Sequence, residues 1–72
     1  MDEQVMVHKV NQIALYFASY PREEAIPGIA DHLLKFWEPR MLRQIQAYVA
    51  AGGANLHELV PASVRLTQRA PA

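Results

Sequence analysis

Proline and glycine divide this sequence into short segments, and three of these segments carry apolar residues three and four positions apart. The breaks fall at Tyr20-Pro21, Glu38-Pro39 and Gly52-Gly53. Apolar residues at that spacing share one face of an α-helix. The residue before a proline avoids helical geometry, and glycine commonly follows the last turn of a helix. No stretch shows the alternation of a half-buried strand, so the pattern predicts an all-α fold, a small three-helix domain.

The same breaks predict where each helix begins and ends. We expect helices over about residues 2–19, 26–37, 39–51 and 61–67, the last being only a short C-terminal helical turn. Residues 1–67 should form a single domain, and residues 68–72 a frayed tail, because the tail has nothing to bury. Since almost no linker separates the second helix from the third, Glu38-Pro39 should form a steep elbow between them.

The sequence allows two possible starting points for the second helix. Pro27 would clash with the carbonyl group four residues earlier if that residue were already helical. The regular helix therefore begins near Pro27, or residues 22–26 form a separate turn ahead of it. We favour a start near Pro27, with the proline in the opening turn.

Composition excludes several classes of protein. The chain has 72 residues and no cysteine, so it has no disulfide and no thiolate metal site. Domains this small usually need a staple, a metal or a partner, and a partner surface is the most economical of these. Lys plus Arg and Asp plus Glu both number 7, which is unlike a nucleic-acid binder. No apolar run approaches the ~20 residues that span a membrane, and the acidic start at Asp2 and Glu3 is unlike a signal peptide, which predicts a cytoplasmic protein.

Residues that could support catalysis or bind a metal are scattered. His8, His32 and His57 lie on three different segments, without the spacing of a metal site. His57-Glu58 begins like a zinc-protease motif, but Pro61 stands where the second histidine is required. The small hydroxyl residues are not in a nucleophile-elbow sequence. We therefore predict that the chain is not an enzyme by itself and has no catalytic, cofactor-binding or metal-binding residues.

The most informative stretch is Phe36-Trp37-Glu38-Pro39-Arg40-Met41. Aromatic residues, arginine and methionine are the types enriched in protein–protein interfaces. Consecutive helical residues point in different directions, so at most one of Phe36 and Trp37 should be central to the core. We predict Trp37, Arg40 and Met41 as partner-contact residues, with Phe36 and Tyr16 as weaker candidates. A cluster of basic residues around the same junction has two interpretations: a basic rim on a docking face, or an ordinary solvated surface. The cluster comprises Lys35, Arg40 and Arg43.

This stretch also carries a resemblance to a known family. The chain resembles the delta subunit of soluble NAD-dependent formate dehydrogenases that contain molybdenum or tungsten, over roughly residues 7–60. The other similar pieces are Asn11-Gln12-Ile13, Arg22-Glu23-Glu24-Ala25, Gly28-Ile29-Ala30, His32, Gly52, Leu56-His57 and Leu59-Val60. Pro27 and the short tail depart from the family pattern.

The resemblance implies a non-catalytic accessory subunit of a complex that oxidises formate and reduces NAD. Bis-molybdopterin guanine dinucleotide, iron–sulfur clusters, FMN and NAD would then be held by other subunits. The expected partners are the large catalytic subunit and the other subunits of that complex, with no nucleic acid and no membrane. The chain would stabilise or assemble the cofactor-bearing subunits. Two alternatives remain: a transient chaperone for insertion of the molybdenum cofactor, or an unrelated helical homodimeric adaptor, including one that binds nucleic acid weakly.

Overall fold

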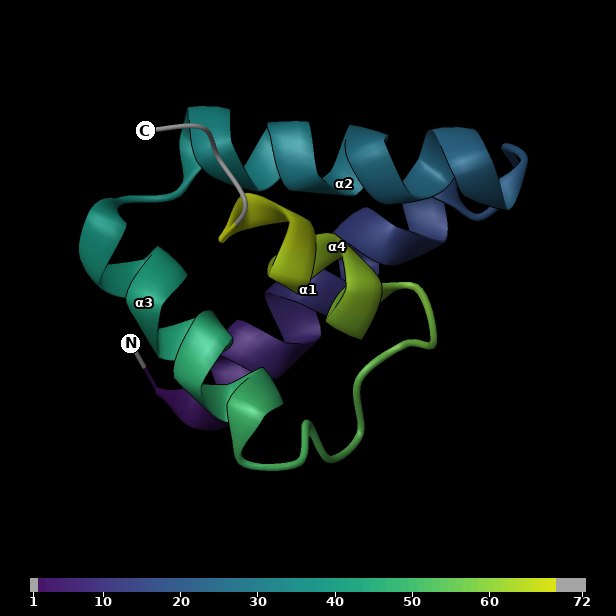
Figure 1. Ribbon diagram of the computed structural model, residues 1–72. Helices are drawn as coiled ribbons and strands as arrows, with labels where there is room; N and C mark the ends of the chain where they lie inside the picture. The colour runs from purple at the N-terminus through teal and green to yellow at the C-terminus, as the bar shows by residue number, and fades with distance from the viewer. Residues whose placement is uncertain (1, 69–72) are drawn as a thin grey trace.

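Four helices make up the fold in this computed structural model, which describes residues 2–68. They are α1 (Glu3–Phe17), α2 (Arg22–Phe36), α3 (Pro39–Ala50) and α4 (Val60–Thr67), shown in Figure 1. No strand occurs among residues 2–68. The prediction of a small all-α fold is confirmed. Of the predicted frayed tail, residues 69–72 lie outside the described residues.

The helix ends follow from local chemistry. Asp2 caps α1, because its carboxylate accepts hydrogen bonds from the backbone N–H groups of Gln4 (2.8 Å) and Val5 (3.2 Å). After α3, Gly52 and Gly53 take φ angles of 128° and 62°, and the Gly53 N–H donates to the Tyr48 carbonyl at 2.9 Å. Glycine adopts this left-handed geometry readily, so the pair ends α3 as the sequence predicts.

The prediction that the second helix starts near Pro27 is wrong. Helix α2 begins at Arg22 and runs through Pro27 without a break. Its first turn is closed by the Pro21 carbonyl, which accepts from Glu24 and Ala25. Pro27 lacks the N–H that would bond to the Glu23 carbonyl, but both residues are exposed, so water can reach that oxygen.

The last helix occupies a more central position than the predicted C-terminal turn would. Figure 1 shows α4 in the middle, with α2 above it, α1 behind it and α3 to one side. Val60, Ser63, Val64 and Thr67 are all buried. The two hydroxyls are satisfied, because Ser63 donates to the Leu59 carbonyl at 2.7 Å and Thr67 donates to the Val64 carbonyl. The core of the domain is therefore built around α4.

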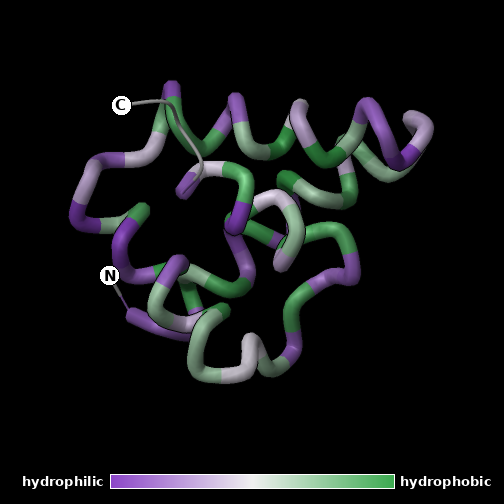
Figure 2. The backbone as a smooth tube through the Cα atoms, in the orientation of Figure 1, coloured by the Kyte–Doolittle hydropathy of each residue, from purple (hydrophilic) through white to green (hydrophobic). Residues whose placement is uncertain are grey.

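The core draws residues from all four helices. Figure 2 shows the hydrophobic residues of α2 on the side that faces the other helices and its hydrophilic residues on the outer side. Trp37, in the short connection between α2 and α3, is 9% exposed and joins this core. The buried apolar cluster comprises Met6, Val10, Ala14, Ala25, Ile29, Leu33, Trp37, Ile45, Leu59, Val60 and Val64. Between α2 and α3 the backbone of Trp37 and Glu38 is extended, and the angle of the elbow stays a prediction.

Candidate partner interface

Several large apolar side chains remain on the surface of the isolated chain. The two most exposed are Phe36, at 71%, and Tyr16, at 69%. Where such side chains gather on one surface, they often mark an interaction site. The full set of exposed large apolar residues is Val5, Leu15, Tyr16, Tyr20, Leu34 and Phe36.

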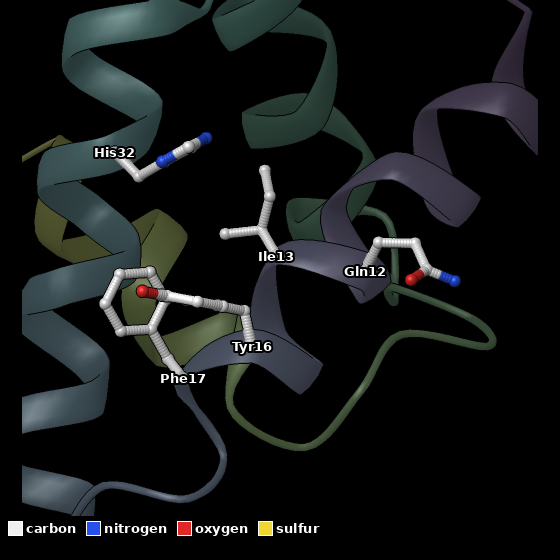
Figure 3. Close-up of a pocket in the computed structure, with 5 residues that line it drawn as sticks. All are labelled: Gln12, Ile13, Tyr16, Phe17 and His32. Atoms are coloured by element: carbon white, nitrogen blue, oxygen red, sulfur yellow. The ribbon is translucent and has the colours of Figure 1, made fainter.

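Tyr16 lines a pocket between α1 and α2. The pocket has a volume of about 430 Å³. Figure 3 shows its lining, in which Ile13, Tyr16 and Phe17 extend from α1 toward α2 and His32 extends from α2. Gln12 completes the rim on the α1 side. The wall is mainly apolar, with hydrogen-bonding groups at its edge, as is usual for a recognition site.

Ring contacts join residues that line the pocket and connect the pocket to Phe36 on α2. The ring centroids of Tyr16 and Phe17 lie 5.1 Å apart and almost perpendicular, at 88°. Phe36 lies one turn beyond His32, and those two ring centroids are 4.8 Å apart. We call the five pocket residues together with Phe36 the aromatic groove. It offers a partner flat, rigid and partly apolar side chains, the kind that supply most binding energy at protein interfaces.

Helix spacing and one glycine build the groove. Tyr16 lies four residues after Gln12 and three after Ile13, so its side chain neighbours both of them on the surface of α1. Between the helices, Phe17 lies directly against Gly28 of α2, where a Cβ atom would meet the Phe17 ring at 2.6 Å. Without a side chain at residue 28, the ring can rest on the helix backbone, which brings α1 and α2 together at the base of the groove.

The predicted contact residues differ widely in how exposed they are. Phe36 and Tyr16, the weaker candidates, are the most exposed, whereas Trp37, a leading candidate, is buried in the core. Trp37 turns inward because α2 ends at Phe36 and the backbone becomes extended, with ψ of 135° at Trp37. Arg40 is exposed, and Met41 is partly buried against the core. As expected, only one of the two consecutive aromatics belongs to the core.

Sequence reasoning missed two features of this region. It assigned no role to His32 beyond the family resemblance, although the four-residue spacing from His32 to Phe36 was a usable signal. It also missed Asn11, whose side-chain amide donates to the Asn55 carbonyl at 2.9 Å and whose side-chain carbonyl accepts from the His57 N–H at 2.8 Å. These bonds hold the connection between α3 and α4 against α1. They join residues far apart in the sequence, so no local sequence pattern could have predicted them.

The described residues do not contain a group suited to metal chemistry. Among residues 2–68, no three or more His, Asp or Glu side chains gather in a way that could hold a metal ion. The sequence has no cysteine, which is the usual ligand of an iron–sulfur cluster. In the same part of the chain, no helix is both long and apolar enough to cross a membrane.

Comparison with known proteins decides the family. Residues 6–64 match the family described as the NADH-dependent formate dehydrogenase delta subunit, FdsD. The chain belongs to the FdsD family. No curated protein and no solved structure gives a significant match. Members of this family are subunits of a formate dehydrogenase complex. The family predicted from the sequence is confirmed.

The FdsD match includes the whole candidate interface. Every residue of the aromatic groove, from Gln12 to Phe36, lies inside the matched range of 6–64. Arg40 and Met41 lie inside it as well, and so do Asn11 and the connection that it holds. The surface described above thus belongs to the FdsD part of the chain, not to an addition outside it.

Proposed function

We propose that this FdsD-family chain is a cytoplasmic, non-catalytic accessory subunit that stabilises or assembles the cofactor-bearing subunits of a NAD-dependent formate dehydrogenase. It docks through the aromatic groove, and its partner is the large catalytic subunit. The carrying observation is the exposure of Tyr16 and Phe36 beside an apolar pocket, in a family defined as a subunit. Trp37 belongs to the core and not to this surface.

Physical chemistry supports docking at this groove. Both rings have few rotatable bonds, so ordering them against a partner costs little conformational entropy. Burying their exposed apolar area removes it from water, which is the main driving force of permanent subunit association. Tyr16 can also keep its hydroxyl hydrogen-bonded at the rim while its ring is covered.

The proposal assigns the redox cofactors to other subunits. An iron–sulfur cluster needs a set of ligands, mostly cysteine thiolates, and this chain has none to offer. The same holds for a metal centre built from three or more acidic or histidine residues of residues 2–68. The chain's own contribution is therefore structural: it covers and orders a neighbouring surface.

The test is co-expression of the chain with a tagged catalytic subunit and the remaining subunits. The amount of chain retained on the tag is quantified for the wild type and for Tyr16→Ala and Phe36→Ala. Removing either ring should weaken association by about 1–2 kcal/mol or more, that is, roughly tenfold. Leu34→Ala is the matched control, because Leu34 is exposed on α2 but lies two residues from both His32 and Phe36, on another side of the helix.

The outcome also separates a subunit from a chaperone. A permanent subunit remains in equal amount with the other subunits in the active, cofactor-loaded enzyme. Retention only on cofactor-free enzyme would favour the chaperone reading. Equal retention of Tyr16→Ala, Phe36→Ala and the wild type would contradict docking through the aromatic groove.

A further inference from the structure

The outward face of α3 carries two arginines and two alanines. Arg40, Arg43, Ala47 and Ala50 are all exposed, and their spacing of three and four residues places them on one face of the helix. Ile45, on the opposite face, is completely buried. Gln44, four residues after Arg40, lies at the edge of this face and is half-buried.

The two arginines oppose the stability of the isolated fold. Arg40 lies in the first turn of α3, where the aligned peptide dipoles disfavour a positive charge, and no acidic residue accompanies it there. Arg43 lies three residues further on, so two like charges are neighbours on the helix surface. Among residues 2–68 neither arginine takes part in an ion pair, since the observed pair joins Lys35 and Asp31 at 3.0 Å.

Five of the seven acidic residues show the opposite pattern. Asp2 caps α1, and the carboxylates of Glu3, Glu23 and Glu24 lie in first turns, where the helix dipole favours them. Asp31 pairs with Lys35 one turn away. The fold therefore uses these negative charges internally. Within the described part of the chain it pairs neither arginine of α3 with a carboxylate, and Glu38, which precedes α3, forms no ion pair with them.

We infer that the outward face of α3 docks an acidic segment of a partner subunit, whose carboxylates pair with Arg40 and Arg43. This inference rests on the proposed function, because it describes a second contact of the same accessory subunit. Guanidinium groups bind carboxylates in a two-pronged geometry that lysine cannot reproduce. The small side chains of Ala47 and Ala50 let the backbone of an extended or helical segment approach the same face.

The experiment compares charge variants of the full chain in the co-expressed complex. Retention on the tagged catalytic subunit is measured at about 50 mM and about 0.5 M NaCl, where the Debye length falls from roughly 14 Å to about 4 Å. The variants are Arg40→Gln with Arg43→Gln and Arg40→Glu with Arg43→Glu. Arg22→Glu is the matched control, because Arg22 opens α2 much as Arg40 opens α3.

We expect affinity at low salt to fall in the order wild type, double glutamine, double glutamate, with a loss of about tenfold or more for charge reversal. At high salt the affinities of the wild type and the double variants should differ less, because salt screens the charges. Both double variants should raise the melting temperature of the chain, since they relieve the dipole and the repulsion, and Arg22→Glu should do the same without lowering affinity. A stabilised chain that binds less well is a result that a purely structural role would not produce.

Two results would overturn the inference. Equal retention of the wild type and both double variants at low salt would show that no acidic segment pairs with these arginines, while leaving the aromatic-groove contact intact. A salt-dependent dimer of the chain alone, lost in the double variants, would show that the face takes a second copy instead. If the wild type is not retained at all, the proposed function falls together with this inference.

Discussion

The ring of Phe17 rests on the backbone of Gly28, so closely that a Cβ atom on residue 28 would lie 2.6 Å from Cε1 of the ring. This contact joins α1 to α2 at the base of the aromatic groove. It makes Gly28 a packing requirement in the interior of a helix, where glycine is otherwise unfavourable by about 1 kcal/mol relative to alanine.

Gly28→Ala should therefore destabilise the fold although it improves helix propensity. Overpacking costs about 1–3 kcal/mol and the propensity gain offsets about 1 kcal/mol, so we expect a net loss on the order of 1 kcal/mol. Thermal unfolding followed by circular dichroism should show a melting point lower by about 5 °C. The double variant Gly28→Ala with Phe17→Leu tests the cause. If the smaller side chain does not reduce the penalty of the alanine, the ring contact is not responsible.

Asn11→Ala should loosen the connection between α3 and α4. The variant removes the partner of the exposed Asn55 carbonyl and of the half-buried His57 N–H, at a cost of about 0.5–1.5 kcal/mol. Asn11→Asp should also destabilise, because a carboxylate can accept from His57 but repels the Asn55 carbonyl. Gln12→Ala, at an exposed neighbour, should change stability by less than about 0.5 kcal/mol. Urea unfolding midpoints of the three variants measure the difference, and an unperturbed Asn11→Asp would argue against the donated bond.

Trp37→Ala and Phe36→Ala should separate folding from binding. Trp37 is buried in the core, so its removal should cost about 3–5 kcal/mol of folding stability. Phe36 is 71% exposed, so its removal should change folding stability by less than about 0.5 kcal/mol and act on partner binding instead. Circular dichroism melts paired with retention on the catalytic subunit measure both effects. A stable Trp37→Ala chain that fails to bind would restore Trp37 as a direct contact residue.

Pro27→Ala should stabilise α2. Alanine restores the N–H that can donate to the Glu23 carbonyl, and it removes the steric conflict of a proline in a helix interior. The larger conformational freedom of the unfolded chain offsets part of this gain, by about 1 kcal/mol. We expect a net stabilisation on the order of 1–2 kcal/mol, seen as a higher melting temperature. An unchanged or lower melting temperature would mean that the proline ring makes a favourable contact of its own.

What the sequence by itself determined is local. Asp2, Pro21, Pro39 and Gly52-Gly53 mark where helices begin and end, because caps and breakers act through backbone geometry within a few residues. The three- and four-residue spacing of apolar side chains likewise placed most of the core on the correct helix faces. Pro27 misled this reasoning, since the local penalty of a proline is outweighed once the surrounding turns are held by tertiary packing.

Only the tertiary structure decided which residues are buried in the core and which remain exposed at the surface. Trp37 and Phe36 are neighbours of similar character, and the end of α2 turns one into the core and leaves the other beside His32. The central position of α4 depends on contacts with all three other helices, although its own sequence pattern is weak. The Asn11 bonds join positions 44 and 46 residues apart. Such contacts form only when distant segments meet, because their energy depends on distance in space. They follow no periodic pattern in the sequence, so the sequence alone does not predict them.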